Sequence, residues 1–285
     1  MNALFLYSEG AGHGQFVRHK EEVLKLLGKR FEKIDVVETS SAEEATKLLQ
    51  NACGVYDAAI VAGGDGTFHN AANALARKEN APVLGYFNSG STGDTGYNFG
   101  ATTSWKKDCK VITEGKIKPM DLIWTNKGCY FTYVAAVGCY APIPYEVPRE
   151  KKKKWGVFAY YGVAARDVFR GKMIHAKVEC DGQSYESDCG FIMALNGCHV
   201  GGVYVNRPSN PFDHKMEIVY TKTRFGKGAL DYVAFRHNLR TVEVRGKAKI
   251  ATDSPLDWDF DGERIPAGDL EVELIPNAIR VFSLR

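Results

Sequence analysis

A short glycine-rich stretch holds the first residues whose types and spacing could do chemistry. In "AAIVAGGDGTFHN", residues 58–70, an apolar strand-like run leads into Gly63, Gly64 and Gly66, and an amphipathic helical pattern follows. Glycines in a turn between a strand and a helix expose backbone N–H groups at the positive end of the helix dipole, which favours phosphate. The turn is therefore expected to bind an anion.

Asp65 stands among these glycines although its carboxylate would repel a phosphate. A cation between the two resolves the repulsion, and Mg²⁺ that bridges carboxylates and a nucleoside triphosphate is the simplest choice. A second interpretation is that Asp65 caps the helix that starts at Thr67, a role that aspartate fills well. The turn alone leaves both interpretations open.

Further acidic residues follow other predicted strands. Asp94 lies in "NSGSTGDTGYNFG", residues 88–100, and Asp121 lies in "KPMDLIW" at the apparent start of a strand. We expect both to join Asp65 at one edge of the sheet, where three carboxylates can hold a metal directly or through water. Glu263, in "DFDGERI", is a candidate proton acceptor, and the competing interpretation is an ordinary hairpin tip.

The elements that position these turns alternate between strand and helix in the first third of the chain. This βαβαβαβ order predicts a parallel sheet covered on both faces, with ligands bound beyond the carboxyl ends of the strands. The glycine-rich turns after the first, third and fourth strands fall at that edge. We expect strands at 3–7, 34–39, 58–62 and 82–87, and helices near 15–27, 42–52 and 67–77.

From about residue 120 the pattern changes to short, mostly alternating segments. "KVECDGQSYES" is typical of a hairpin, and "MEIVYTK", "TVEVRGKAKIA", "LDWDFDGERI" and "LEVELI" predict further strands. The fold class is therefore α/β plus all-β: a three-layer αβα domain with a parallel sheet, then a β-sandwich-like domain. We place the domains at 1–122 and 123–276, with 277–285 as a strand that returns to the first domain and one helix at 155–171.

Composition excludes few functions. The chain of 285 residues is 45% apolar and 25% charged, as ordinary globular proteins are, and a net charge of +3 is too small to imply nucleic acid. The 7 cysteines form no C-x-x-C pair and are expected to be small buried residues in a reducing compartment. The N-terminus resembles a first core strand rather than a signal peptide, and no run approaches the roughly 18 apolar residues that span a bilayer. A cytoplasmic protein is predicted.

Several segments together resemble, in order, the diacylglycerol kinase catalytic family, which includes bacterial soluble lipid kinases and the sphingosine kinases. They are "VAGGDGT", "NSGSTGD", "ALNGCHVGG", "RPSNPFDHKMEIV" and "DFDGERIPAGDLEVELIPNAIRVF". The resemblance runs essentially from end to end, and the joint pattern is more specific than GGDGT alone, which NAD kinases share.

The resemblance implies a role for each matching position. Asp65, Asp94 and Asp121 correspond to a network of carboxylates, water and Mg²⁺, Glu263 to the general base, and Asp213 to a second, structural Mg²⁺ site. The residues that correspond to contacts with the co-substrate ATP are Gly12, Gly14, Thr39, Gly63, Gly64, Asp65, Gly66, Thr67 and Ser91.

The implied activity is that of an ATP- and Mg²⁺-dependent lipid kinase that converts diacylglycerol to phosphatidic acid. A base in the second domain and a nucleotide in the first would place the chemistry in a cleft between them. The basic run at 151–155 is a candidate for transient contact with the inner face of the membrane, and the competing interpretation is a solvated loop before a packed helix. No nucleic acid partner is expected, and a homodimer is left open.

Because the sequence departs from the family pattern at several positions, two alternative functions are considered. The usual Pro-x-Gly-Thr-x-Asn-Asp is Asn88-Ser89-Gly90-Ser91-Thr92-Gly93-Asp94 here, and the usual Asp-Gly of the structural metal site is Asp213-His214. One alternative is a nucleotide-binding regulator at the membrane surface that has lost turnover. The other is NAD kinase, against which stands Gly197, where an acidic residue would be expected.

Overall fold

The computed structural model describes residues 1–8, 15–90, 93–101, 104–138, 173–221, 239–255 and 257–285. The chain forms two compact units, one of Met1–Leu122 with Pro276–Arg285 and one of Ile123–Ile275. The chain passes from one unit to the other within β5 (Lys116–Thr125) and again within β18 (Leu270–Ser283).

A parallel sheet forms the centre of the first unit. Its strand order is β2-β1-β3-β4-β18, and the register pairs Phe5 with Ile60 and Val61 with Tyr86. Every residue of β3 and β4 is buried, which explains why these strands are nearly continuous apolar runs. The strands that open the unit are β1 (Asn2–Tyr7), β2 (Lys33–Glu38), β3 (Ala58–Gly63) and β4 (Val83–Asn88).

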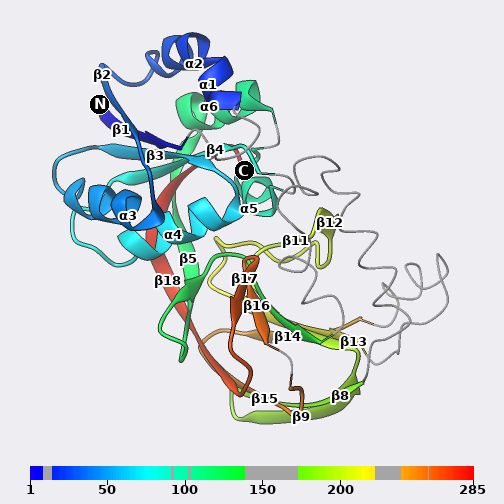
Figure 1. Cartoon of the computed structure of the whole chain (residues 1–285). Coiled ribbons are helices and arrows are strands. Elements are labelled where there is room, and N and C mark those ends of the chain that lie inside the picture. The colour runs from blue at the N-terminus through cyan, green and yellow to red at the C-terminus, as the bar shows by residue number, and fades with distance from the viewer. Residues whose placement is uncertain (9–14, 91–92, 102–103, 139–172, 222–238, 256) are drawn as a thin grey trace. The chain divides into compact units, whose positions relative to one another are not determined.

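Helices cover both faces of this sheet, as predicted. Figure 1 shows α3 and α4 on one face and α1, α2 and α6 on the other. Amphipathic spacing decides which side chains face the sheet: α2 buries Val23 and Leu27, and α4 buries Phe68 and Ala72. The helices are α1 (Gln15–Arg18), α2 (Lys20–Leu27), α3 (Ala42–Asn51), α4 (Asp65–Leu75), α5 (Asp94–Phe99) and α6 (Trp105–Glu114).

The end of the chain completes the sheet, so the predicted return of the last strand is confirmed. β18 lies parallel to β4, with Val281 opposite Leu84. Val281 and Phe282 are buried, and the Arg30 guanidinium lies 4.3 Å from the Phe282 ring centroid. Arg30 also donates to the carbonyl of Gly115 at 2.7 Å, so one side chain connects the last strand to the start of β5.

The second unit is built from antiparallel strands, as the alternating pattern predicts. One sheet has the order β18-β15-β8-β9 and the other β14-β13-β10-β7-β16-β17. Apolar side chains from both sheets, among them Ile218, Ile250 and Trp258, form one buried core, which is the arrangement of a β-sandwich. The strands are β6 (Tyr130–Phe131), β7 (Val134–Gly138), β8 (Ile174–Cys180), β9 (Gln183–Cys189), β10 (Phe191–Leu195), β11 (His199–Val200), β12 (Val203–Tyr204), β13 (Met216–Thr221), β14 (Leu239–Val244), β15 (Lys247–Thr252), β16 (Trp258–Phe260) and β17 (Glu263–Ile265).

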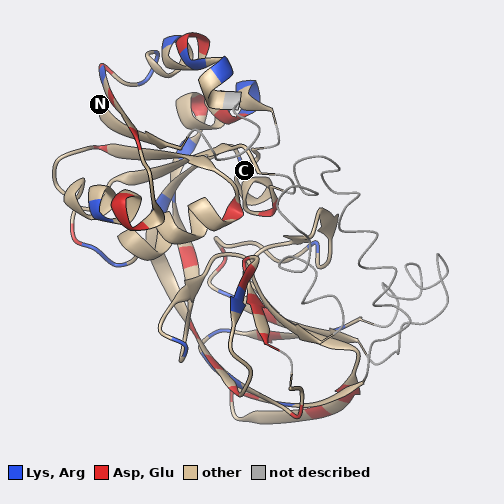
Figure 2. Cartoon of the chain, viewed as in Figure 1, with Lys and Arg blue, Asp and Glu red and all other residues tan. Residues whose placement is uncertain are grey.

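Charged residues of both signs are interspersed over the described parts of both units (Figure 2). On the exposed face of the second unit, Lys177 pairs with Glu179 at 2.7 Å and Lys247 with Glu273 at 3.2 Å. Such exposed pairs contribute little to stability.

Two sequence predictions fall on parts of the chain that the structure leaves undescribed. These are the helix at 155–171 and the basic run at 151–155. Within the described ranges, no helix has the length and apolar character needed to cross a bilayer. Burial beside Asp108 raises the pKa of the Cys109 thiol to about 12, so this cysteine behaves as the small buried residue that was predicted.

Candidate functional site

The predicted phosphate turn joins β3 to α4. Gly64 is the N-cap residue of α4, and its carbonyl accepts the N–H of Thr67 at 3.0 Å. The Thr67 side chain folds back onto Gly63, where an added Cβ would lie 2.1 Å from the threonine Oγ1. The start of a helix favours an anion, so the turn before α4 is a candidate phosphate site.

Asp65 is the first residue of α4, and its carboxylate reaches a different helix. Its Oδ1 accepts the N–H of Thr95, in the first turn of α5, at 2.9 Å. The interpretation that Asp65 caps its own helix is therefore wrong, since Gly64 occupies the cap position and no side chain bonds there. Asp65 connects the two turns that follow β3 and β4.

Asp94 lies beside this connection as the first residue of α5, and it is 2% exposed. A third carboxylate, Asp108 in the first turn of α6, is fully buried and accepts the N–H of Asn88 at 3.0 Å. The Tyr86 phenol is also buried, and burial together with Asp65, Asp108 and Asp94 raises its pKa well above the usual range. The phenol therefore stays protonated and donates to Asn88 Oδ1 at 3.2 Å.

Asp121 does not share this edge of the sheet, which corrects the prediction of three carboxylates together. Its Oδ1 accepts the N–H of Asn277, which precedes Val281 on β18, and Val281 pairs with Leu84 near the start of β4. Asp121 thus lies at the amino ends of the parallel strands, whereas Asp65 follows the carboxyl end of β3. A six-residue strand spans about 20 Å, too far for one hydrated ion to contact both carboxylates.

Of the other predicted nucleotide contacts, the structure describes Thr39. Thr39 directly follows β2 and is almost buried, and its hydroxyl donates to the carbonyl of Tyr7 at 3.2 Å. The hydroxyl therefore holds the ends of β1 and β2 together at the carboxyl edge. Gly12, Gly14 and Ser91 lie outside the described residues.

Glu263 lies in the second unit, exposed, at the start of β17. It follows a tight turn in which Asp261 and Gly262 both have positive φ, 51° and 94°. The buried Asp261 carboxylate accepts hydrogen bonds from Thr132 N at 2.6 Å, Thr132 Oγ1 at 2.9 Å, Tyr133 N at 3.0 Å and Val134 N at 3.1 Å. These contacts fix the hairpin that presents Glu263.

The other side of the hairpin is held by an ion pair. Arg264 Nε donates to Asp257 Oδ2, and this hydrogen bond lowers the pKa of the Asp257 carboxyl. Asp257 also accepts the N–H of Ala267 at 2.8 Å. The residues on both sides of Glu263 therefore have defined partners, while the glutamate itself faces solvent.

Asp213 lies in the second unit. Its Oδ2 accepts from Asn210 Nδ2 at 2.9 Å, and the next residue, His214, has the positive φ of 57° that a glycine would favour. Glu217 is 4% exposed, and burial raises the pKa of its carboxyl. Over the described ranges, no three His, Cys, Asp or Glu side chains are arranged to hold a metal, so neither predicted Mg²⁺ set forms an all-protein cage.

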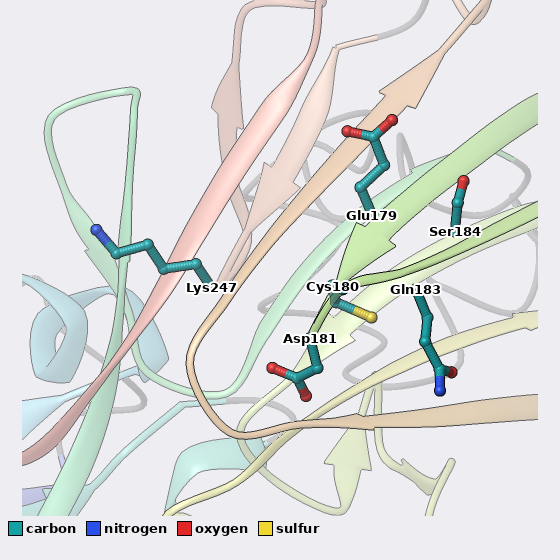
Figure 3. A pocket seen from close by; sticks show the side chains of 7 residues that line it. Glu179, Cys180, Asp181, Gln183, Ser184 and Lys247 are labelled. Carbon is teal, nitrogen blue, oxygen red and sulfur yellow. The ribbon is translucent and has the colours of Figure 1, made fainter.

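A surface depression of about 410 Å³ lies elsewhere, at the tip of the β8–β9 hairpin (Figure 3). Its lining includes Glu179, Asp181 and Lys247, and none of the predicted site residues. The depression is open to solvent, and it is the concave side of a tight turn in which Asp181 and Gly182 have positive φ.

The sequence of this chain is similar to those of known diacylglycerol kinases. The profile of the family described as "Diacylglycerol kinase catalytic domain" matches residues 2–125. A diacylglycerol kinase of Staphylococcus aureus (strain MRSA252) is 30% identical over 283 residues, which cover 95% of this chain and 90% of the relative. A diacylglycerol kinase of Bacillus subtilis (strain 168) is 26% identical over 275 residues, or 92% of this chain and 89% of the relative.

Solved structures agree on the fold. The crystal structure of a diacylglycerol kinase from Bacillus anthracis str. Sterne superposes with a TM-score of 0.80 at 24% identity, and the match covers 99% of this chain and 96% of that one. The similarity to the Staphylococcus aureus relative extends over nearly the whole of both chains. The chain therefore belongs to the diacylglycerol kinase catalytic family, a family of lipid kinases.

Proposed function

We propose that this protein transfers the γ-phosphoryl group of ATP to the hydroxyl of a neutral lipid, with diacylglycerol as the acceptor and phosphatidic acid as the product. The observation that carries the proposal is the hydrogen bond between Asp65 and the N–H of Thr95. It makes the two small-residue turns after β3 and β4 one assembly at the carboxyl edge of the sheet, where α/β folds bind ligands. Family membership and the names of the relatives support the same chemistry.

The nucleotide is proposed to bind to the first unit. The N–H groups at the start of α4 would hold the phosphates, and the strongly electrostatic nature of phosphoryl transfer makes such donors effective. Gly63, Gly64, Gly66 and Thr67 supply this turn. Thr39, Gly12, Gly14 and Ser91 remain proposed contacts on the strength of the family resemblance.

Asp65 and Asp94 fit a nucleotide-bound Mg²⁺. This ion usually takes one or two carboxylates, with substrate phosphates and water as its other ligands, so a pair suffices where a cage is lacking. Bound there, Mg²⁺ would neutralise charge on the transferring phosphoryl group. We leave Asp121 out of this proposed ion because its carboxylate accepts the N–H of Asn277 on β18, and we propose only weak metal binding at Asp213, where His214 replaces the usual glycine.

Glu263 is proposed as the general base. A lipid hydroxyl is a poor nucleophile, so a carboxylate must accept its proton as the phosphoryl group transfers. Glu263 faces solvent on a turn that Asp261 holds in place, which leaves its carboxylate accessible to an acceptor. We assign lipid binding to the second unit, and a transient contact with the inner face of the membrane to residues 151–155.

A transfer assay tests the proposal directly. Purified protein is incubated with γ-labelled ATP and Mg²⁺, and with diacylglycerol micelles, sphingoid base micelles or NAD in parallel. Label in diacylglycerol is expected. Label in NAD, or in the sphingoid base alone, would contradict the proposed acceptor, and ATP binding without transfer to any acceptor would favour a regulator.

Glu263→Gln separates catalysis from nucleotide binding. Because Glu263 and the nucleotide turns belong to different units, ATP affinity should stay within about twofold while kcat falls by about 10²–10⁴-fold. Glu271→Gln, an exposed glutamate on β18, is the matched control and should behave as wild type. Near-normal kcat for Glu263→Gln would remove Glu263 from the role of base.

Asp65→Asn tests the proposed ion. The amide oxygen can still accept the N–H of Thr95, so thermal stability should change little, while the lost charge weakens Mg²⁺. We expect kcat to fall about 100-fold and the Mg²⁺ concentration for half-maximal rate to rise. An unchanged Mg²⁺ titration, with the exposed Glu79→Gln as control, would show that Asp65 has only its hydrogen-bonding role.

A further inference from the structure

The end of β4 departs from the family pattern at two positions that meet in space. The usual proline and asparagine of Pro-x-Gly-Thr-x-Asn-Asp are Asn88 and Gly93 in this chain. Asn88 is the last residue of β4 and is fully buried, and Gly93 is the N-cap residue of α5. Taken singly, each departure weakens the resemblance at the second turn.

The Asn88 side chain forms hydrogen bonds with residues close to the end of β4. Its Oδ1 accepts the N–H of Gly90 at 2.9 Å and the Tyr86 hydroxyl at 3.2 Å. Its own backbone N–H donates to the buried Asp108 at 3.0 Å. The Asn88 amide is thus held by the Tyr86 hydroxyl and the Gly90 N–H, while the backbone of Asn88 is held by Asp108 of α6.

The amide nitrogen of Asn88 occupies the place of a side chain at position 93. A Cβ added to Gly93 would lie 2.1 Å from Asn88 Nδ2, a distance that no side chain could keep. Gly93 has φ of +63°, which glycine and asparagine tolerate better than other residues. The position of the Asn88 amide therefore requires glycine at position 93.

Ser89 and Gly90, which follow Asn88, pack directly on the proposed phosphate turn after β3. A Cβ on Gly90 would lie 2.9 Å from the Cα of Gly64, and the N–H of Ser89 donates to the carbonyl of Gly63 at 2.9 Å. Any shift of Gly90 is thus transmitted to the backbone whose N–H groups are proposed to bind the phosphates.

We propose that Asn88 is a positioning residue for ATP, whose side-chain amide holds Gly90 against the Gly63–Gly66 turn and replaces the asparagine that the family pattern has at position 93. The proposal rests on the proposed function, since it assumes that these turns bind a nucleotide. Asn88 itself is buried and acts through Gly90 and Gly63, without contact with the nucleotide.

A double-mutant cycle tests the proposal. Asn88→Ala removes the acceptor for the Gly90 N–H, and we expect the Kd and KM for ATP to rise about tenfold with kcat within threefold of wild type. Gly93→Asn places a side chain against the Asn88 amide and should weaken ATP at least as much. The variant with both substitutions moves the asparagine to its usual family position and should regain ATP affinity to within about threefold, a non-additive result.

Two further variants provide a milder change at Asn88 and a control. Tyr86→Phe retains the ring and removes only the hydroxyl that donates to Asn88, so it should fold and weaken ATP by about two- to fivefold. Asn51→Ala, at the exposed end of α3, is the control and should bind ATP as wild type does. Thermal melting of each variant separates loss of fold from loss of affinity.

The outcomes distinguish the two proposals. Wild-type Kd for ATP in folded Asn88→Ala, or additive losses in the double variant, would overturn the role of Asn88. A wild-type chain that binds ATP but phosphorylates no lipid would contradict the proposed function alone, because the Kd series still reports on Asn88. A chain that binds no ATP would contradict both.

Discussion

Asp65 bonds to the backbone of α5, and it is also a proposed ligand of Mg²⁺. Its Oδ1 accepts the N–H of Thr95 in the first turn of α5, directly after Asp94, while Asp65 itself begins α4. A helix start also favours a negative charge, so Asp65 is stabilised as a carboxylate in the position where a cation would need it.

Asp261 carries the clearest stability prediction at this scale. Asp261→Ala would leave three buried backbone N–H groups, those of Thr132, Tyr133 and Val134, without their acceptor. Each such loss costs about 1–3 kcal/mol, so we expect the free energy of unfolding to fall by about 3–5 kcal/mol in urea titrations. Asp269→Ala, which removes only an exposed 3.7 Å pair with Lys249, should change it by less than about 1 kcal/mol. Similar values for the two variants would contradict this account of the hairpin.

Asp261 and Asp108 could not be found from the sequence for a physical reason. An Asp-Gly pair predicts a tight turn, and that turn is present, but its carboxylate is satisfied by residues 127–129 positions earlier in the chain. Asp108 lies in a helix with no glycine turn nearby, and its partner Asn88 is on a strand. Long-range acceptors leave no local pattern, whereas Asp65 could be predicted because its glycines are adjacent.

At the scale of elements, strands with strong patterns were predicted well. The expected strands at 3–7, 34–39, 58–62 and 82–87 match β1 to β4 within one residue at each end, because buried parallel strands are continuous apolar runs. The "KVECDGQSYES" hairpin is confirmed as β8 and β9, paired from Ile174 with Cys189 to Cys180 with Gln183. Periodicity fails where helices are short: α5 has 6 residues and contains Gly96, so no helical stripe forms.

The β8–β9 pair yields a prediction about pH. A hydrogen bond that the imidazole of His175 donates to Asp188, its cross-strand partner, raises the pKa of the imidazole, which favours its charged form in the folded state. That contribution is fully present below about pH 6.5 and is lost as pH rises through the raised folded pKa. The melting temperature of wild type should therefore exceed that of His175→Gln by more at pH 5.5 than at pH 8.5.

Lys177→Gln is the control for this measurement. Its pair with Glu179 is on the same strand, but a lysine stays charged throughout this pH range, so its effect on the melting temperature should be the same at both values. An equal effect of His175→Gln at the two pH values would show that the imidazole pair does not contribute to folding.

At the scale of the whole molecule, the last residues of the chain are part of the core of the first unit. Phe282 is 2% exposed, and Phe282→Ala should lower the free energy of unfolding by about 3–5 kcal/mol in urea titrations. Leu284→Ala, two residues further and 45% exposed, should change it by less than about 0.5 kcal/mol. Equal effects would mean that the terminal strand is not packed as described.

Chain direction explains why the position of Asp121 was not predicted. The sequence places Asp121 at the apparent start of a strand, but β5 begins at Lys116, where Gly115 lies against the backbone of Ser283. From there β5 runs toward the amino ends of the parallel strands, so a residue inside it is carried away from the site. Strand boundaries of this kind depend on pairing with β18, which lies more than 140 residues later in the chain.

The contact between Gly64 and Gly90 limits how this site can change. A side chain at Gly90 would meet the backbone of Gly64 at 2.9 Å, and one at Gly64 would lie 3.5 Å from the Cα of Gly90. In a saturation library, tolerance at one position would depend on the other, and most variants at Gly90 should be lost. New nucleotide preferences would therefore have to arise at residues that border this contact, such as Thr39 and Thr67, while the two glycines stay unchanged.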